Sequence, residues 1–283
     1  MAMRVTKPRA LTEGDTKIRL LDAADRLFIE HGAEQMSLRA VTGLAGVNIA
    51  AVNYHFGGKD RLLAAVLARR LDPLNEERSA LLDACERHWP GPGLTCEHVL
   101  AALFVPALRQ ANEAGPEAMA RLRFLGRAYS DSSAFTVAFL KQRYDSTGAR
   151  FVEAFARALP DLPRADLKLR LVVVLRSVAG LIAGGDLPDL LAAFDRGAGS
   201  TEIRDARLLG SLGSLLAGAL MAPPPARDRT RIFSAVFALA AKQVDADPPE
   251  AAARASRPAR ATSVRTARPV RIADRLKDAD AAD

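Results

Sequence analysis

Three consecutive polar side chains, Asn53, Tyr54 and His55, follow two alanines, Ala50 and Ala51, in one short, mainly apolar segment. An asparagine amide donates and accepts hydrogen bonds, which suits the edge of a base, whereas tyrosine and histidine suit phosphate oxygens. Alanine is small enough to let a helix approach base edges, and its methyl group can contact the methyl group of thymine. The segment therefore has the chemistry of a nucleic-acid reading surface, provided that one exposed helix face carries these residues.

The residues around this segment predict two short helices joined by a tight turn. Ser37 can cap a first helix that runs to Leu44, and Asn48 can cap a second helix that runs to Phe56. Gly46 lies in the turn between them, where a side chain would crowd the sharply bending chain. Two short helices and one tight turn are the geometry of a helix-turn-helix motif.

A longer helix precedes this pair and is expected to supply the core on which it rests. The helix signals place Asp15 at its start and Gly32 just past its end. Its apolar residues recur at three-and-four spacing, as in an amphipathic helix: Ile18, Leu21, Ala24, Leu27 and Phe28. The apolar residues of the two short helices and their turn are expected to face this core: Val41, Leu44, Val47 and Val52.

Two cations flank the motif. Lys59 follows two glycines and opens the next helix, so its charge adds to the partial positive charge of a helix N-terminus, which attracts anions. Arg39, in the first short helix, can reach a phosphate or a base.

The stretch from Asp15 to about Asp72 resembles the DNA-binding domain of the TetR family of one-component regulators. The resemblance rests on an opening helix that ends in Phe28 and Gly32 and on three motifs: Met36-Ser37-Leu38-Arg39, Ala45-Gly46-Val47, and Tyr54-His55-Phe56 with Lys59. The sequence departs from the family pattern at Asn53, where an aromatic residue is frequent, and at Thr42, where alanine is usual. These departures bear on base preference and not on the fold.

The resemblance implies a role for each residue of the motif. Five side chains would position the phosphate backbone: Ser37, Arg39, Tyr54, His55 and Lys59. Three residues would lie nearest the bases, with Asn48 beside them at the helix start: Ala50, Ala51 and Asn53.

Helical periodicity dominates the whole sequence, and no alternating run predicts a strand. We therefore expect an all-α fold, with a three-helix helix-turn-helix DNA-binding domain and a larger C-terminal helical domain for ligand binding and dimerisation. The expected division is a flexible basic arm over 1–14, the DNA-binding domain over 15–74, the helical domain over 75–245 and a disordered, arginine-rich tail over 246–283.

The resemblance further implies a homodimer formed through the last two long helices of the C-terminal domain. Residues 164–183 and 201–221 predict such helices. These helices contain four glycines: Gly180, Gly210, Gly213 and Gly218. The glycines would allow the helices of two protomers to pack closely, or they would merely loosen the helices. A later amphipathic helix would cover the bundle with its apolar face: Ile232, Phe233, Val236, Phe237 and Leu239.

The stretch from Arg121 through Tyr144 to Pro160 resembles the C-terminal domain of the subgroup that contains fatty-acid-responsive repressors. This resemblance implies a small-molecule inducer such as a fatty acid or an acyl-CoA-like compound. Candidates for an apolar pocket are Phe104, Leu125, Tyr129, Phe139 and Leu175, with Arg121 or Arg127 for an acidic head group. The same spacing of aromatic residues also fits an ordinary core.

The chain has 283 residues with 49% hydrophobic and 26% charged, and a net charge of +7. This composition is typical of a globular protein and favours a polyanionic partner. Six arginines and no acidic residue lie between Arg254 and Arg271. The alternative function is therefore a nonspecific binder of nucleic acid or of a membrane surface, driven by this tail. A solvated tail without function is also compatible.

Other chemistry finds little support. The pairs Cys85 with His88 and Cys96 with His98 could meet around zinc, but their spacing matches no common site. We find no nucleophile with its base, no paired carboxylates and no phosphate-binding glycine loop, so neither an enzyme nor a cofactor is expected. The longest apolar run, residues 208–221, is too short to span a bilayer and predicts a buried helix.

The sequence thus predicts a homodimeric transcriptional regulator, a repressor that binds double-stranded DNA at a palindromic operator and is released by a small apolar or acyl-type ligand. No secretory signal is apparent and only two cysteines are present, so a cytoplasmic, nucleoid-associated protein is expected, without a membrane partner.

Overall fold

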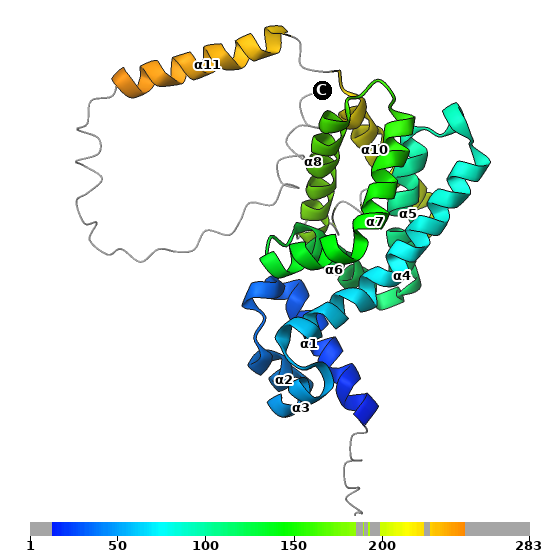
Figure 1. Cartoon of the computed structure of the whole chain (residues 1–283), viewed down its shortest axis with the longest axis vertical. Helices are drawn as coiled ribbons and strands as arrows, with labels where there is room; N and C mark the ends of the chain where they lie inside the picture. Colours follow the sequence, from blue (N-terminus) through cyan, green and yellow to red (C-terminus); the bar gives the residue numbers. More distant parts are fainter. Residues whose placement is uncertain (1–12, 185–188, 190–191, 193–198, 224–226, 247–283) are drawn as a thin grey trace, which may run out of the picture. The chain divides into compact units, whose positions relative to one another are not determined.

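The computed structural model describes residues 13–184, 189, 192, 199–223 and 227–246, and these residues form helices and short connections without a strand (Figure 1). They belong to two compact units, which meet in sequence between Met221 and Ala222. The helices of the first unit are α1 (Glu13–Gln35), α2 (Leu38–Ala45), α3 (Ile49–Phe56), α4 (Lys59–His88), α5 (Cys96–Glu113), α6 (Ala118–Ser130), α7 (Ala134–Ala158), α8 (Arg164–Ala183) and α10 (Thr201–Met221). Short 3-10 turns lie at Gly91–Gly93 and Gly115–Glu117. The expected all-α fold is confirmed for the described residues.

Helices α1 to α4 share a hydrophobic core with α6. Leu20, Phe28 and Val52 are fully buried in it, and the ring of Phe28 lies 5.2 Å from that of Phe124 on α6. Two expected core residues are not buried, because Ile18 is 56% exposed and Leu44 is 51% exposed. Leu20 and Ala45 are buried in the core. Each lies one or two residues from the expected position, and one residue along a helix turns a side chain by about 100°.

The helical conformation of α1 is broken at Gly32, as expected, with a φ of 74°. Beyond this kink a further helical segment continues to Gln35. The left-handed conformation at Gly32 favours glycine. A Cβ atom on Gly32 would also lie 2.8 Å from Oδ2 of Asp131, at the end of α6. The glycine therefore marks the point where α1 contacts α6.

Helix α4 is 30 residues long and continues through Pro73, across the expected domain limit at residue 74. Its side chains tie it to α7, because Asp72 accepts hydrogen bonds of 2.6 and 2.7 Å from Arg143 and of 2.7 Å from the Tyr144 hydroxyl. The bonds from Arg143 lower the pKa of Asp72, although burial opposes the shift. The limits of the expected domains remain a prediction.

A second core lies among α4, α5, α7, α8 and α10. Its fully buried members include Leu82, Val99, Phe155, Leu167 and Leu220. Figure 1 shows these helices side by side, beyond the end of α4 that contacts α1 to α3. The two larger cores are thus joined by the continuous helix α4, and Leu122 of α6 lies in a smaller apolar cluster with Ala111 of α5.

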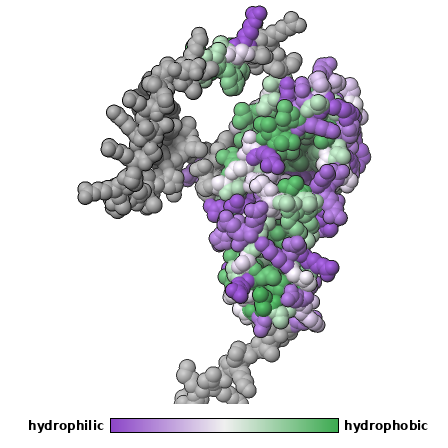
Figure 2. Space-filling model, turned by 60° about the vertical axis from the view of Figure 1, so that its left-hand side comes forward, coloured by the Kyte–Doolittle hydropathy of each residue, from purple (hydrophilic) through white to green (hydrophobic). Residues whose placement is uncertain are grey.

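Helices α8 and α10 have the bounds predicted for the two long helices. The run over 208–221 is buried along one face only, because Leu216 and Leu220 are buried whereas Leu215 is 68% exposed. On α8, Leu169 and Val173 are likewise exposed. The prediction of a buried helix is therefore wrong for one face of α10. Figure 2 shows that the described residues expose hydrophobic areas between hydrophilic ones on this face of the molecule.

The second unit contains α11 (Arg227–Ala246), the predicted amphipathic helix. Its large apolar side chains are exposed within this unit: Ile232, Phe233, Val236, Phe237 and Leu239. That this helix covers the bundle stays a prediction. The basic arm and the arginine-rich tail lie almost wholly outside the described residues. In the described part of the chain, no helix has the length and hydropathy needed to cross a membrane.

Candidate functional site

The two caps of the helix-turn-helix motif are confirmed. Oγ of Ser37 accepts a 3.1 Å hydrogen bond from the amide of Ala40 at the start of α2, and Oδ1 of Asn48 accepts one of 2.9 Å from the amide of Ala50 at the start of α3. Each bond satisfies a backbone donor that the helix itself leaves without a partner. The capping oxygens of Ser37 and Asn48 are thereby fixed at the N-terminal ends of α2 and α3.

The turn between α2 and α3 depends on Gly46. This residue has a φ of 63°, and a Cβ atom there would lie 2.8 Å from a guanidinium nitrogen of Arg19 on α1. The amide of Val47 donates a 3.1 Å hydrogen bond to the carbonyl of Thr42, which closes the end of α2. The expected crowding at Gly46 is thus confirmed, together with a left-handed backbone.

Helix α3 separates its buried and exposed faces clearly. Val52 and Phe56 are buried in the core, whereas Asn53 and Tyr54 are exposed, with Tyr54 at 74%. Asn53 and Tyr54 are adjacent on this outward face. Ala50 is exposed as well. Three residues of the expected outward face, Ala50, Asn53 and Tyr54, are therefore exposed as predicted.

Two members of the expected face are only half-exposed. Ala51 packs partly against the core, and His55 is half-buried with its ring edge-on to Tyr54 at 5.0 Å. Their contacts with DNA stay predictions.

The cations of the motif surround α3. Arg39 is exposed on α2, while Nζ of Lys59 donates a 3.2 Å hydrogen bond to the carbonyl of Glu34 and so ties the start of α4 to the end of α1. Two further exposed cations were not predicted: Arg19 lies at the Gly46 turn, and Arg61 lies beside Gly57 at the end of α3. A signal for both was present in the sequence, because Arg19 and Arg61 are basic residues of the helices that flank the motif.

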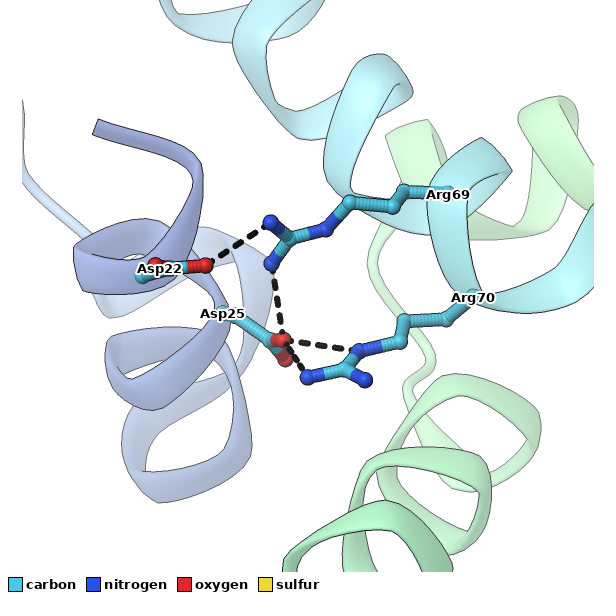
Figure 3. A network of polar contacts seen from close by, with 4 residues as sticks. All are labelled: Asp22, Asp25, Arg69 and Arg70. Atoms are coloured by element: carbon cyan, nitrogen blue, oxygen red, sulfur yellow. Dashed lines mark hydrogen bonds and ion pairs between the residues drawn. The ribbon is translucent and has the colours of Figure 1, made fainter. Parts of the chain in front are cut away.

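A buried ionic cluster fixes α4 against α1 (Figure 3). Oδ2 of Asp25 accepts hydrogen bonds from Arg69 at 3.1 Å and from Nε of Arg70 at 2.8 Å, and it also contacts Nη2 of Arg70. Asp22 accepts a further 2.8 Å bond from Arg69. Asp25 is only 3% exposed, so its own contacts with the two arginines are shielded from solvent. The cluster holds the motif at a defined place on α4.

The larger part of the first unit contains three adjoining cavities. The central cavity, of about 140 Å³, lies among α4, α5, α6 and α8. Four of the seven predicted ligand residues line it: Phe104, Leu125, Tyr129 and Leu175. The apolar cavity, of about 450 Å³, extends toward α10 and shares Phe104 and Val178 with the central one. The outer cavity, of about 730 Å³, shares Tyr129 and Leu175 with it and reaches α7.

The other three predicted ligand residues lie elsewhere. Phe139 stacks on Phe135 and packs against the first core. Nε of Arg127 donates a 3.2 Å hydrogen bond to the carbonyl of Ile29 on α1. Arg121 is half-buried and lines none of the three cavities, and its Nε has no hydrogen-bond partner among the described residues. The structure therefore brings neither predicted arginine to the cavities.

The buried cation at the cavities is Arg78 on α4, which the sequence reasoning missed. It is 7% exposed and lines both the central and the outer cavity. A signal was present in the sequence, because Arg78 lies four residues from Leu74 and four from Leu82, on the apolar stripe of its helix. A charged residue at such a place requires a polar partner or a ligand.

The four side chains that could have met around zinc lie in other environments. Cys85 and Cys96 are free and buried, and burial raises the pKa of Cys96 to about 12. Nδ1 of His98 accepts a 3.1 Å hydrogen bond from the amide of Thr95, and the His98 ring stacks on Trp89 at 3.9 Å. Within the described ranges, no cluster of histidine, cysteine and carboxylate side chains could hold a metal ion.

Two family models match the chain over the parts just described. Residues 20–66 match the model of bacterial regulatory proteins of the tetR family, and residues 101–208 match that of the tetracyclin repressor-like C-terminal domain. The first match covers the helix-turn-helix motif with its flanking helices, and the second covers α6 to α8 with most of α5.

Three curated bacterial proteins are similar to the chain over about one hundred residues. SrpR of Pseudomonas putida, an HTH-type transcriptional regulator, is 34% identical over 99 residues, which are 35% of this chain and 45% of SrpR. TtgW, an uncharacterized HTH-type transcriptional regulator of the same species, is 34% identical over 35% of this chain and 71% of TtgW. BepR of Brucella suis, an HTH-type transcriptional repressor, is 31% identical over 38% of this chain and 46% of BepR. The chain thus spans about half the length of SrpR and of BepR.

Among solved structures, a TetR-like transcriptional regulator from Rhodococcus sp. RHA1 aligns with 76% of this chain and 96% of its own, at 21% identity and a TM-score of 0.45. The motif geometry, the match of residues 20–66 to the family model and the 34% identity over most of TtgW agree. The chain belongs to the TetR family of bacterial regulatory proteins.

Proposed function

We propose that the chain is a homodimeric, sequence-specific DNA-binding regulator, a repressor that leaves a palindromic operator when a small ligand binds. The observation that carries this proposal is the exposed face of α3, where Asn53 and Tyr54 project from a capped helix next to Ala50. A rigid helix with small residues at its start and an amide beyond them fits the major groove. The similarity to BepR, a repressor by name, favours repression.

The contacts with DNA divide into two kinds. The exposed amide of Asn53 suits a base edge. Exposed Arg39 and Tyr54 and the half-exposed His55 and Lys59 suit phosphate oxygens. Ala50 and Ala51 allow close approach. In a dimer, two copies of α3 about one DNA turn apart, ~34 Å, would read the two halves of a palindrome.

The exposed apolar residues of α8 and α10 support a homodimer. Leu169, Val172 and Val173 on α8 and Leu215 on α10 are all more than half exposed in one protomer. The space where a Cβ atom would lie is open at the four predicted glycines: Gly180, Gly210, Gly213 and Gly218. Helices with small residues can approach closely, so a second copy of these two helices would complete a four-helix interface.

Helix α6 offers a mechanical connection between the cavities and the motif. Its residue Tyr129 lines the central cavity, while Arg127 and Asp131 bond to backbone groups of α1 at Ile29 and Ala33. A ligand that shifts α6 would therefore shift α1 and the core on which α3 rests. Such a ligand lowers operator affinity if it binds better to the shifted state than to the DNA-bound one.

Selection of bound duplexes from a random pool tests the proposal. The full-length protein is used at about 150 mM salt, where binding that rests on phosphate contacts alone is weak. We expect enrichment of a palindrome whose half-sites lie about one DNA turn apart. Retention of duplexes without a common sequence would contradict the proposal and would favour a nonspecific binder.

A further inference from the structure

Arg78 is a buried cation with only neutral partners. Its Nε donates a 2.9 Å hydrogen bond to the carbonyl of Leu103, and its Nη1 donates to the Tyr129 hydroxyl at 2.8 Å and to Oδ1 of Asn75 at 3.4 Å. No carboxylate among the described residues forms an ion pair with it. The neighbouring acid on the helix, Glu77, pairs with Arg109 instead. A guanidinium buried in this way lacks the counter-charge that normally accompanies it.

The guanidinium lies where the cavities meet. Arg78 and Tyr129 line both the central and the outer cavity, and Phe104 lines both the central and the apolar cavity. Nη2 of Arg78 makes no hydrogen bond to the part of the chain that the structure describes. The Tyr129 hydroxyl accepts from Arg78 and so keeps its own proton to donate. Two donors are therefore available at one end of an apolar space.

We propose that this space binds a monocarboxylate with an apolar body, whose carboxylate is held by Arg78 and Tyr129 and whose body lies against Phe104, Leu125 and Leu175. The planar fork of a guanidinium fits a carboxylate in a bidentate manner. One further cation, the exposed Arg176, also lines the central cavity. The apolar cavity beside the central one, of about 450 Å³, suits the body of a small organic ligand, since such sites usually measure 300 to about 1,000 Å³.

Only one part of this inference rests on the proposed function, namely that binding of the carboxylate controls DNA binding. The binding site itself stands on the geometry of α4, α5, α6 and α8. Arg78 takes the part that the sequence reasoning gave to Arg121 or Arg127, neither of which lines a cavity.

The test compares decanoate with decan-1-ol, which has the same chain length and no charge, by isothermal titration of the full-length protein without DNA. Decanoate is expected to bind at least about tenfold more tightly, because charge-assisted hydrogen bonds favour the anion. In Arg78→Gln this preference should disappear, while the affinity for decan-1-ol changes less than about threefold. The matched control is Arg109→Gln, an arginine that is 60% exposed and lines none of the cavities, and it should keep the preference.

Two further variants keep the test decisive if Arg78→Gln does not fold. Tyr129→Phe removes one donor and keeps the ring, so it should weaken decanoate binding several-fold without affecting decan-1-ol. Arg78→Lys keeps the charge and loses the fork, so it should reduce the preference without abolishing it.

Equal affinity of the wild type for decanoate and decan-1-ol, or binding of neither, would overturn the inference. So would a preference that Tyr129→Phe and the Arg78 variants leave unchanged. Since no DNA is present, failure here leaves the regulator proposal intact. Failure of the duplex selection would in turn leave the carboxylate site standing.

Discussion

The carboxylate of Asp131, at the end of α6, accepts a 3.0 Å hydrogen bond from the backbone amide of Ala33, in the last turn of α1. The contact is possible because Gly32 has no side chain, since a Cβ atom there would lie 2.8 Å from the same carboxylate oxygen. Together with the bond from Arg127 to the carbonyl of Ile29, it connects the helix that lines the central cavity to the helix that supports the DNA-reading motif.

Asp131→Asn should lower the free energy of unfolding by about 1 kcal/mol at neutral pH, because the amide retains one acceptor oxygen where the carboxylate has two. Burial alone would raise the pKa of Asp131, but hydrogen bonds from Ser133 and Ala33 outweigh it and lower the pKa below its ordinary value.

A lowered folded-state pKa gives stability that is complete above the unfolded-state value of about 3.9 and is lost as the pH falls through the lower, folded-state value. The difference between wild type and variant should therefore shrink as the pH falls below about 4. Denaturant unfolding at pH 7 and at acid pH measures it, and a difference that grows on acidification would contradict this role of Asp131.

The two aspartates of the α1–α4 cluster should differ strongly in their effect on stability. Asp25→Asn removes the charge shared by Arg69 and Arg70 at a site that is 3% exposed, and breaking a buried pair of this kind costs about 3–5 kcal/mol. Asp22→Asn is the matched control, because Asp22 pairs only with Arg69 and its side chain is 54% exposed, so it should cost less than about 1 kcal/mol. Equal losses in chemical denaturation would show that burial does not distinguish the two.

Gly126 permits close contact between the backbones of α6 and α8. A Cβ atom there would lie 2.8 Å from the carbonyl carbon of Ile182 and 2.9 Å from the carbonyl oxygen of Ala179. Gly126→Ala should therefore destabilise the protein by about 1–3 kcal/mol. Gly148→Ala in α7 meets nothing within 4 Å and should instead stabilise it by about 0.5–1 kcal/mol. Thermal melting of both variants checks the contrast, and a neutral Gly126→Ala would refute the close contact.

Leu215→Glu should prevent dimerisation without unfolding the protomer. The side chain is 68% exposed in one chain, so a charge costs little there, whereas it would be buried in the proposed interface of α8 and α10. Val137→Glu on α7 is the control, because Val137 is also exposed but lies outside that interface. Sedimentation analysis should show a monomer for the first variant and a dimer for the second. A Leu215→Glu dimer would place the interface elsewhere.

Local signals were sufficient for the motif and for the long helices. The caps Ser37 and Asn48 and the turn glycine Gly46 each act through backbone groups within a few residues, so their geometry follows from the sequence. The bounds of α8 and α10 follow from flanking glycine and proline.

Long-range packing could not be predicted in the same way. Ile18 belongs to one of several apolar stripes that fit α1, and packing against α2, α3, α4 and α6 selects the stripe with Leu20 and Phe28. Gly126 is an ordinary helix residue until α8 approaches it, and the apolar stripe that contains Arg78 does not indicate that Tyr129 of α6 is its partner. Which arginine faces a cavity is decided by tertiary contacts such as the one between Arg127 and Ile29.

The most direct test of the account titrates the selected duplex and a base-scrambled duplex of equal length with the wild type, Asn53→Ala and Lys59→Ala. The wild type should prefer the selected duplex by at least about 1,000-fold at about 150 mM salt. Asn53→Ala should reduce this ratio by about 10-fold or more, whereas Lys59→Ala should weaken both duplexes alike and lower the salt slope by about one. Equal binding of both duplexes by the wild type, or a ratio unchanged in Asn53→Ala, would contradict sequence reading by α3.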